Sequence, residues 1–420
     1  MSSAPDACQK MQELDVLPVR AGTPALRRVI DEIRVAAGAA KQAGSPLHPV
    51  IDLVRASRLG AFRIPLVDGG GGATVREYFA MLIDLAEADA DVAHILRAHY
   101  WFIEERLRAA DSAQRTRWIT RAVAGEIFGN AVTEMGGSAA VGSWVLQTHL
   151  EPTASGYTLT GRKYYCTGSM YSDWVMVMAS TADGKLASAV VPTARKGVTL
   201  EDDWDGIGQR LTGSGTGIFD AVAVEPDEIL MAGVESTEAA SLENPTEPYL
   251  VGQFCQLILT AIIAGVMRNV VNDAVRMVRK RGRTYTHGSA ETAAADPILQ
   301  QVIGQIASHT FAAEAMVLVA ADAQDAALAT VVNGLADFDL AHRASLLTAQ
   351  AKVVIDELAP RAATMLFDVG GSSAVKQSEN LDCHWRNIRT LSSHNPTPYK
   401  ARALGSFLVN GEQLPTNGFF

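Results

Sequence analysis

Apolar residues recur at helical spacing in the first part of the chain. The clearest run is Leu26, Val29, Ile30 and Ile33. Steps of three and four residues place such side chains on one face of a helix. Four consecutive glycines at 69–72 interrupt the pattern, and Thr74 supplies an N-cap for the helix that follows. The pattern predicts a helical domain over residues 1–125.

Short runs rich in β-branched and aromatic residues replace the helical pattern after residue 126. Gly, Pro and Asp turns separate them, as between strands. The runs occupy residues 145–150, 157–160, 174–178, 187–191 and 217–220. They predict a central β-barrel or β-sandwich domain over residues 126–235, with 228–249 as the connector to the next part.

Long apolar helices return after residue 250 and are predicted at 253–281, 298–333 and 340–366. The longest apolar run, 257–266, is shorter than the roughly 18 residues of a membrane span, and it predicts a buried helix. These helices predict a four-helix bundle over residues 236–420. One chain offers too little surface to cover all the apolar faces, so a homo-oligomer is expected. The whole chain is predicted to be an α+β protein.

The composition fits a compact soluble enzyme, because 48% of the 420 residues are hydrophobic and 20% are charged. A net charge of -10 argues against a nucleic-acid binder. One basic cluster, large enough for a single phosphate or pyrophosphate, consists of Arg276, Arg279, Lys280, Arg281 and Arg283. A solvated helix face is the alternative reading.

The four cysteines are widely spaced and form no C-x-x-C pair, so the sequence predicts no metal site and no disulfide framework. The N-terminus lacks a basic segment followed by an apolar one. A cytoplasmic protein is therefore expected, with no membrane and no nucleic-acid partner.

Two segments carry the candidate chemistry. Residues 129–136 read GNAVTEMG, and residues 159–168 read LTGRKYYCTG, which contains the pattern G-x-K-x-x-x-T-G. In this order and at this spacing they resemble the flavin-binding β-domain of the acyl-CoA dehydrogenase superfamily. The resemblance implies that Thr133 and Thr167 contact the isoalloxazine ring, with Asn130 and Cys166 as further candidates. It also implies a structural role for Glu134.

Further segments agree with this family. Residues 203–216 resemble the segment before its last β-strand. Residues 279–285 resemble the turn that holds the flavin phosphate, which implies roles for Arg279 and Arg283. Residues 367–372 resemble a Gly-Gly turn that meets the cofactor of a neighbouring subunit, which implies contacts from Gly370, Gly371 and Ser372. The resemblance covers nearly the whole chain and implies a tetramer.

The chain departs from the dehydrogenases at the catalytic base. The C-terminal Glu is missing from residues 385–396, and the alternative helix position reads Phe254-Cys255-Gln256. Without a carboxylate over the substrate α-carbon, proton abstraction loses its general base. The pattern R-N-x-R-T-x-x-x-H-N-P at 386–396 instead resembles the flavin-dependent monooxygenase branch, which includes dibenzothiophene monooxygenase and the two-component hydroxylases.

In that branch a separate NAD(P)H:flavin reductase supplies reduced FMN or FAD, which reacts with O2 to a C4a-(hydro)peroxyflavin that oxygenates the substrate. The resemblance places His394 near flavin C4a, and the ordinary pKa of an imidazole suits proton transfer at neutral pH. His99 is a second candidate beside a substrate pocket of Tyr100, Trp101 and Phe128, with a core histidine as the alternative reading. His94 is expected to be structural.

Three hypotheses follow. The first is a bacterial two-component flavin monooxygenase that oxygenates sulfur, nitrogen or carbon of a small hydrophobic or aromatic molecule. The second is an acyl-CoA dehydrogenase or flavin oxidase whose base is Asp382 or Glu379. The third is a flavin-binding scaffold without turnover.

Overall fold

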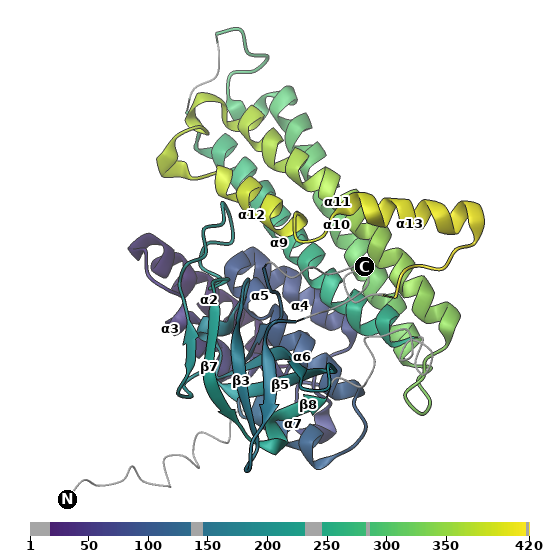
Figure 1. Ribbon diagram of the computed structural model, residues 1–420. Coiled ribbons are helices and arrows are strands. Elements are labelled where there is room, and N and C mark those ends of the chain that lie inside the picture. Colours follow the sequence, from purple (N-terminus) through teal and green to yellow (C-terminus); the bar gives the residue numbers. More distant parts are fainter. Residues whose placement is uncertain (1–16, 136–145, 232–245, 283–285, 417–419) are drawn as a thin grey trace, which may run out of the picture. The chain divides into compact units, whose positions relative to one another are not determined.

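A computed structural model describes residues 17–135, 146–231, 246–282, 286–416 and 420 (Figure 1). The chain forms two compact units. Unit 1 comprises Met1–Tyr78, Ile95–Trp204 and Gly213–Val234. Unit 2 comprises Phe79–His94, Asp205–Thr212 and Glu235–Phe420.

Unit 1 contains the helices α2 (Pro24–Ala43), α3 (His48–Ser57), α6 (Arg97–Arg108) and α7 (Ala113–Val123). The apolar stripe predicted for the first helix is buried, from Leu26 to Ile33. Helix α4 (Val75–Ala88) begins with the predicted Thr74 cap: the Glu77 N–H donates to Thr74 Oγ1 (3.1 Å), and Thr74 N–H donates to Glu77 Oε2 (2.9 Å). Both predictions are confirmed.

In the part of unit 1 that the structure describes, the sheet has eight strands: seven in the order β6-β7-β3-β2-β4-β5-β8, and β1, which pairs with β4 in parallel. The strands are β1 (Phe128–Ala131), β2 (His149–Pro152), β3 (Tyr157–Lys163), β4 (Trp174–Thr181), β5 (Leu186–Pro192), β6 (Val198–Leu200), β7 (Gly217–Val224) and β8 (Ile229–Met231). All five predicted β-rich runs contain or adjoin a strand.

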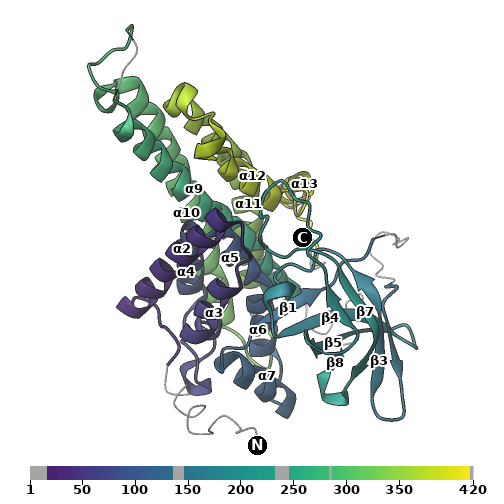
Figure 2. The same cartoon turned by 90° about the vertical axis from the view of Figure 1, so that its left-hand side faces the viewer.

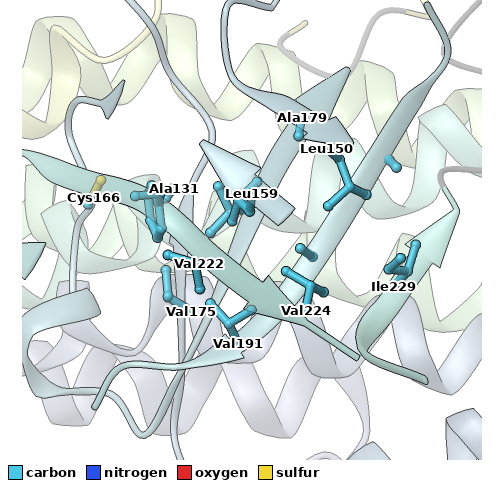
Figure 3. Packing of buried hydrophobic residues seen from close by; sticks show 14 residues of the cluster. Ala131, Leu150, Leu159, Cys166, Val175, Ala179, Val191, Val222, Val224 and Ile229 are labelled. Carbon is cyan, nitrogen blue, oxygen red and sulfur yellow. The ribbon is translucent and has the colours of Figure 1, made fainter. Parts of the chain in front are cut away.

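Both faces of β4 are buried, and alternate residues enter different cores. Val175 and Val177 pack in the sheet cluster shown in Figure 3, with Leu159, Val191 and Val222. Trp174 and Met176 point the other way, into a second cluster that includes residues of α6 and α7. Figure 2 shows these two helices beside the sheet. The predicted helical and β-domains therefore share a core, which is why one compact unit contains parts of both.

Unit 2 is helical. Its elements are α5 (Ala90–Ile95), α9 (Gln253–Lys280), α10 (Pro297–Leu328), α11 (Phe338–Gly370), α12 (Asp382–Ser392), α13 (Thr397–Asn410) and most of α4. Helix α9 packs against α10, α11 and α12, and α13 packs against α11. Residues 257–266 of α9 are buried throughout, as predicted.

Arg268 on α9 explains why residues 79–94 belong to unit 2. Its guanidinium binds Glu314 of α10 at 2.7 Å and Asp84 and Glu87 of α4 at 2.6 and 3.2 Å. One side chain thus ties α4 and α10 to α9. The predicted α+β architecture is confirmed, and the three predicted domains stay a prediction.

Within the described ranges, two helices are long and apolar enough to cross a membrane, by length and composition. In Pro248–Lys280 the most apolar window is 100% buried, as in the core helix of a folded domain. In Pro297–Leu328 only 22% of that window is buried. A single chain therefore leaves one apolar side of α10 uncovered.

Candidate active site

The two motif segments meet in unit 1. The Tyr164 N–H donates to the Thr133 carbonyl oxygen at 2.9 Å, in an isolated antiparallel bridge. The ammonium of Lys163 lies 3.3 Å from the Val132 carbonyl oxygen. Segments roughly thirty residues apart in sequence are thus joined side by side, as the family resemblance implied.

Lys163 and Glu134 form an ion pair beneath this junction. Lys163 is fully buried, and its Nζ lies 2.6 Å from Glu134 Oε1. The same carboxylate accepts the N–H groups of Gln147 and Thr148 and the Thr148 hydroxyl. Burial disfavours the charged form of Glu134, but hydrogen bonds from Lys163 and Thr148 outweigh it and lower the pKa of the carboxyl. Its acceptor positions are used within the fold, in agreement with the predicted structural role.

Both glycines of the pattern G-x-K-x-x-x-T-G have a steric reason. A Cβ on Gly161 would lie 2.3 Å from Thr148 Oγ1. A Cβ on Gly168 would lie 2.3 Å from the Ile95 carbonyl oxygen, and the φ of Gly168 is +78°, which favours glycine. The two glycines are therefore required because β3 and the turn after it lie very close to neighbouring segments.

The side chains of Cys166 and Thr167 lie in different environments. The Cys166 side chain is buried in the sheet cluster (Figure 3), and burial raises its pKa to about 12. The thiol is therefore protonated and enclosed, which counts against a contact between this side chain and the flavin. Thr167 is half-buried, with its hydroxyl 2.8 Å from Ser214 Oγ. Of the two neighbours, Thr167 is the one that fits the predicted role.

The first motif segment supplies two further neutral side chains that can form hydrogen bonds, Thr133 and Asn130. Thr133 is exposed, and Asn130 on β1 is half-buried. The Asn130 Oδ1 atom is shielded from solvent and makes no hydrogen bond to any part of the chain that the structure describes. Buried polar atoms normally have a partner, so an unsatisfied amide oxygen marks a place for a ligand. Hydroxyl and amide groups of this kind fit the polar edge of an isoalloxazine ring.

The predicted substrate pocket is instead part of the core. His99 is fully buried; its Nε2 lies 2.9 Å from the Gly60 carbonyl oxygen, and its Nδ1 accepts the Phe128 N–H at 3.2 Å. Burial lowers the pKa of His99 to about 4. Both ring nitrogens bind backbone groups, so the geometry is that of a core histidine and does not support a catalytic role.

The aromatic neighbours of His99 are also structural. The Tyr100 hydroxyl donates to the Leu59 carbonyl oxygen at 2.6 Å. Phe128 stacks on Phe102 with ring centroids 4.3 Å apart. Trp101 is half-buried against the same cluster. The expectation that Tyr100, Trp101 and Phe128 line a substrate pocket is therefore not supported, because Tyr100 and Phe128 are buried and Trp101 packs against the core cluster.

His394 lies just beyond the C-terminal end of α12 in unit 2, and its side chain is exposed. Its Nδ1 is 3.0 Å from Asn395 Oδ1, and Asn395 Nδ2 donates to Gln256 Oε1 on α9 at 2.7 Å. Gln256 is buried, and it belongs to the helix segment where some dehydrogenases carry a Glu base. In this chain Gln256 is a neutral amide, and its oxygen already accepts a hydrogen bond from Asn395.

The alternative bases are engaged in ion pairs. Glu379 binds Arg276 at 3.1 Å and Lys280 at 3.7 Å, and the hydrogen bond from Arg276 lowers the pKa of the carboxyl. Asp382 binds Arg386 one turn along α12 at 2.9 Å. The lowered pKa makes Glu379 a weaker base. This pairing counts against the dehydrogenase hypothesis.

Sequence reasoning missed a buried connection between α5 and α12. Gln209 is fully buried at a φ of +53°, which is unusual for a residue with a side chain. Its N–H donates to Asn387 Oδ1 at 2.8 Å, and its Oε1 lies 3.0 Å from His94 Nδ1. Asn387 is the Asn of the R-N-x-R-T pattern, so the pattern itself was the available signal.

The predicted phosphate and Gly-Gly residues lie at helix ends in unit 2. Arg279 is exposed in the last turn of α9, and Arg283 lies outside the described residues. Gly370 ends α11, Gly371 has a φ of +56°, and Ser372 is exposed. Unit 2 also contains a groove of about 440 Å³, which is lined by Ile207, Thr364, Phe367, Asp382, Trp385 and Arg386. Among the described residues, no three His, Cys, Asp or Glu side chains are grouped to bind a metal.

Two family models match the chain. Residues 129–222 match "Acyl-CoA dehydrogenase, middle domain", and residues 257–398 match "Acyl-CoA dehydrogenase, C-terminal domain". The probable FMNH2-dependent monooxygenase SfnC of Pseudomonas putida is 29% identical over 377 residues, which cover 88% of this chain and 89% of that protein. A dibenzothiophene monooxygenase of Rhodococcus erythropolis is 28% identical over 402 residues, 94% of each chain.

Solved structures agree. The chain resembles TdsC from Paenibacillus sp. A11-2 in complex with FMN and indole, with a TM-score of 0.84 and 26% identity over 94% of this chain and 98% of that one. It also resembles the methanesulfinate monooxygenase MsuC from Pseudomonas fluorescens, with a TM-score of 0.84 and 26% identity over 95% and 100%. The chain belongs to the acyl-CoA dehydrogenase superfamily. Within it, the chain is a flavin-dependent monooxygenase, as the C-terminal segment predicted.

Proposed function

We propose that this chain is the oxygenase of a two-component system, in which a separate NAD(P)H:flavin reductase supplies reduced FMN. The observation that carries the proposal is the C-terminal segment. It presents an exposed histidine, His394, where the dehydrogenases require a carboxylate, and the remaining candidate carboxylates are paired with cations. The bound flavin would supply the two electrons that activate O2, with one oxygen atom passing to the substrate and the other to water.

The residues of unit 1 are suited to hold the ring. Thr133, Thr167 and Asn130 offer hydroxyl and amide groups. Arg279 and Arg283 do not belong to this unit, and the family resemblance alone assigns them to the flavin phosphate. Gly370, Gly371 and Ser372 are proposed to approach the cofactor of a neighbouring subunit. FMN is favoured over FAD because SfnC is named as FMNH2-dependent and TdsC was solved with FMN. His394 is proposed to hold or deliver a proton at its imidazole ring.

An aromatic pair, exposed Tyr165 and half-buried Trp204, favours an apolar, ring-containing substrate. Tyr165 directly precedes Cys166 and Thr167; it is 55% exposed and has a φ of +57°. Its ring meets that of Trp204 edge to face, with centroids 6.0 Å apart. A strained, exposed aromatic side chain beside a functional motif is typical of a binding site. Dibenzothiophene and indole are the first compounds to assay, with sulfur, nitrogen or carbon as the oxygenated atom.

Anaerobic stopped-flow spectroscopy tests the proposal. The protein is mixed with reduced FMN and then with oxygenated buffer. A monooxygenase should show an absorbance transient, distinct from both reduced and oxidised flavin, before oxidised flavin appears. Immediate reoxidation with FMN and with FAD would contradict the proposal. Bleaching of bound oxidised flavin by an acyl thioester would support the dehydrogenase instead, and neither reaction would be expected of a scaffold.

Replacing Thr167 with alanine should weaken binding of reduced FMN about tenfold, because one hydrogen bond to the ring is lost. Anaerobic fluorescence titration measures the dissociation constant. Thr160→Ala is the matched control, since Thr160 lies on the preceding strand β3 with an exposed side chain. Equal affinities for the two variants would remove Thr167 from the binding site.

We further propose a cytoplasmic homo-oligomer, in line with the predicted tetramer. The uncovered side of α10 exposes Phe311, Ile298 and Val319 by 75%, 60% and 50%. A second copy of the chain would bury such a surface. Phe311→Glu should therefore lower the molar mass measured by light scattering after gel filtration. Val35→Glu, at a 73% exposed position of α2, is the control. An unchanged mass for Phe311→Glu would exclude α10 from the interface.

A further inference from the structure

The turn that carries His394 is fastened to two helices by buried polar side chains. On α11, Lys352 Nζ donates to the Ser392 carbonyl oxygen at 3.3 Å and binds Asp356 at 2.7 Å. The same Asp356 oxygen accepts the Thr397 hydroxyl. Contacts on both sides of His394 thus fix the backbone from residue 392 to residue 397. The turn is preorganised rather than loose, although it lies between helices.

The side chain of His394 is held by a second connection, through α9. Asn395 is 7% exposed and Gln256 is 3% exposed. Because Asn395 Nδ2 donates to Gln256 Oε1, the amide oxygen of Asn395 is the atom turned toward His394. An oxygen can only accept, so His394 Nδ1 carries the hydrogen. In the neutral ring, Nε2 is then the atom that accepts a proton.

We propose that Asn395 and Gln256 are positioning residues that keep His394 in the Nδ1–H tautomer. This inference rests on the proposed role of His394 in oxygen transfer. With Nδ1–H held by Asn395, the imidazole takes up and releases a proton at Nε2 without changing its orientation. Gln256 contributes by fixing which end of the Asn395 amide meets the ring. Neither residue needs to touch flavin or substrate.

Charged side chains help to hold the turn, whereas the side chain that contacts His394 is a neutral amide. Lys352 and Asp356 of α11 form one pair, and Lys400 of α13 is a second buried cation whose pKa burial lowers to about 8. Gln256 of α9 is uncharged. A carboxylate in place of Asn395 would stabilise the imidazolium, whereas the amide orients the ring and leaves both protonation states accessible.

The test begins with flavin-free protein and measures the modification of His394 by diethyl pyrocarbonate across pH. The reagent attacks the unprotonated ring, so peptide mass spectrometry of the modified residue yields its pKa. Asn395→Asp should raise this pKa by about one unit or more, because an adjacent negative charge favours the imidazolium. Asn410→Asp, which adds the same charge at an exposed position of α13, should leave it unchanged.

Oxygen-transfer coupling, the ratio of product formed to O2 consumed, is measured next. Gln256→Leu should lower it about threefold to tenfold, and Gln256→Glu should largely restore it, since a carboxylate also accepts from Asn395. The pH at half-maximal coupling should move upward in Asn395→Asp. Wild-type pKa and wild-type coupling in both Asn395→Asp and Gln256→Leu would overturn the inference.

The two proposals fail in different ways. Unchanged coupling in His394→Ala would contradict the role of His394, while the pKa shift in Asn395→Asp would still establish the positioning contact. Loss of coupling in His394→Ala, together with wild-type behaviour of both positioning variants, would contradict the inference alone. Circular dichroism and gel filtration of each variant distinguish these outcomes from misfolding.

Discussion

Replacing His394 with alanine is expected to lower the ratio of product formed to O2 consumed by about a hundredfold or more, with H2O2 released in place of product. General acid–base groups contribute about 10²–10⁴ to a rate, and in the proposed mechanism no second histidine replaces this one, because His99 is enclosed in the core. Affinity for reduced FMN should change less than about threefold, because His394 is not proposed to hold the ring.

Oxygen-electrode and H2O2 assays measure this ratio. A readout without substrate is also available: the delay before oxidised flavin appears in stopped-flow should shorten about tenfold or more. His149→Ala is the matched control, since His149 is exposed on β2 and belongs to no motif. Full coupling in His394→Ala would show that the proton comes from elsewhere, and His94, held by Gln209, would be the next residue to replace.

Neutralising Glu134 should destabilise the protein more than neutralising Lys163. Glu134→Gln leaves the Lys163 ammonium buried without a counter-ion, and breaking a buried ion pair in this way costs about 3–5 kcal/mol. Burial already lowers the pKa of Lys163, and Glu134 only partly offsets it. Lys163→Met removes that desolvated charge, while Glu134 keeps three donors from Gln147 and Thr148. We expect a loss of at most about 2 kcal/mol for this variant.

Urea denaturation followed by tryptophan fluorescence measures the difference, since five of the six tryptophans belong to unit 1. The double variant should be more stable than Glu134→Gln, because it buries neither charge. If Glu134→Gln instead kept the stability of the wild type and lost turnover, Glu134 would act as a catalytic base and the structural role assigned to it would be wrong.

Most of the helices and strands could be predicted from the spacing of residue types along short stretches of sequence. Helical periodicity revealed α2, α4 and the bundle helices, because each buries one stripe or its whole circumference. The pattern G-x-K-x-x-x-T-G was informative because its glycines are required by close approach to Thr148 and Ile95. The family resemblance also identified two segments that the structure joins through Thr133 and Tyr164.

Side-chain direction was the main source of error. Cys166 and Thr167 are adjacent in sequence, and only the course of the chain after β3 decides which one enters the core. His99 resembled a catalytic residue because of its type and its aromatic neighbours. Its two backbone partners, Gly60 and Phe128, lie 39 and 29 positions away, and no local pattern reports them.

The sequence by itself determined the order of helices and strands, because these depend on residue type and local period. It also determined the superfamily, the missing base and the candidate His394, because its motifs resemble those of a known family. Tertiary structure decided which buried groups meet: Lys163 with Glu134, Gln209 with His94, and Gln256 with Asn395. Each of these contacts joins elements distant in sequence. A hydrogen bond between such elements depends on how the chain packs, which no short window of residues contains.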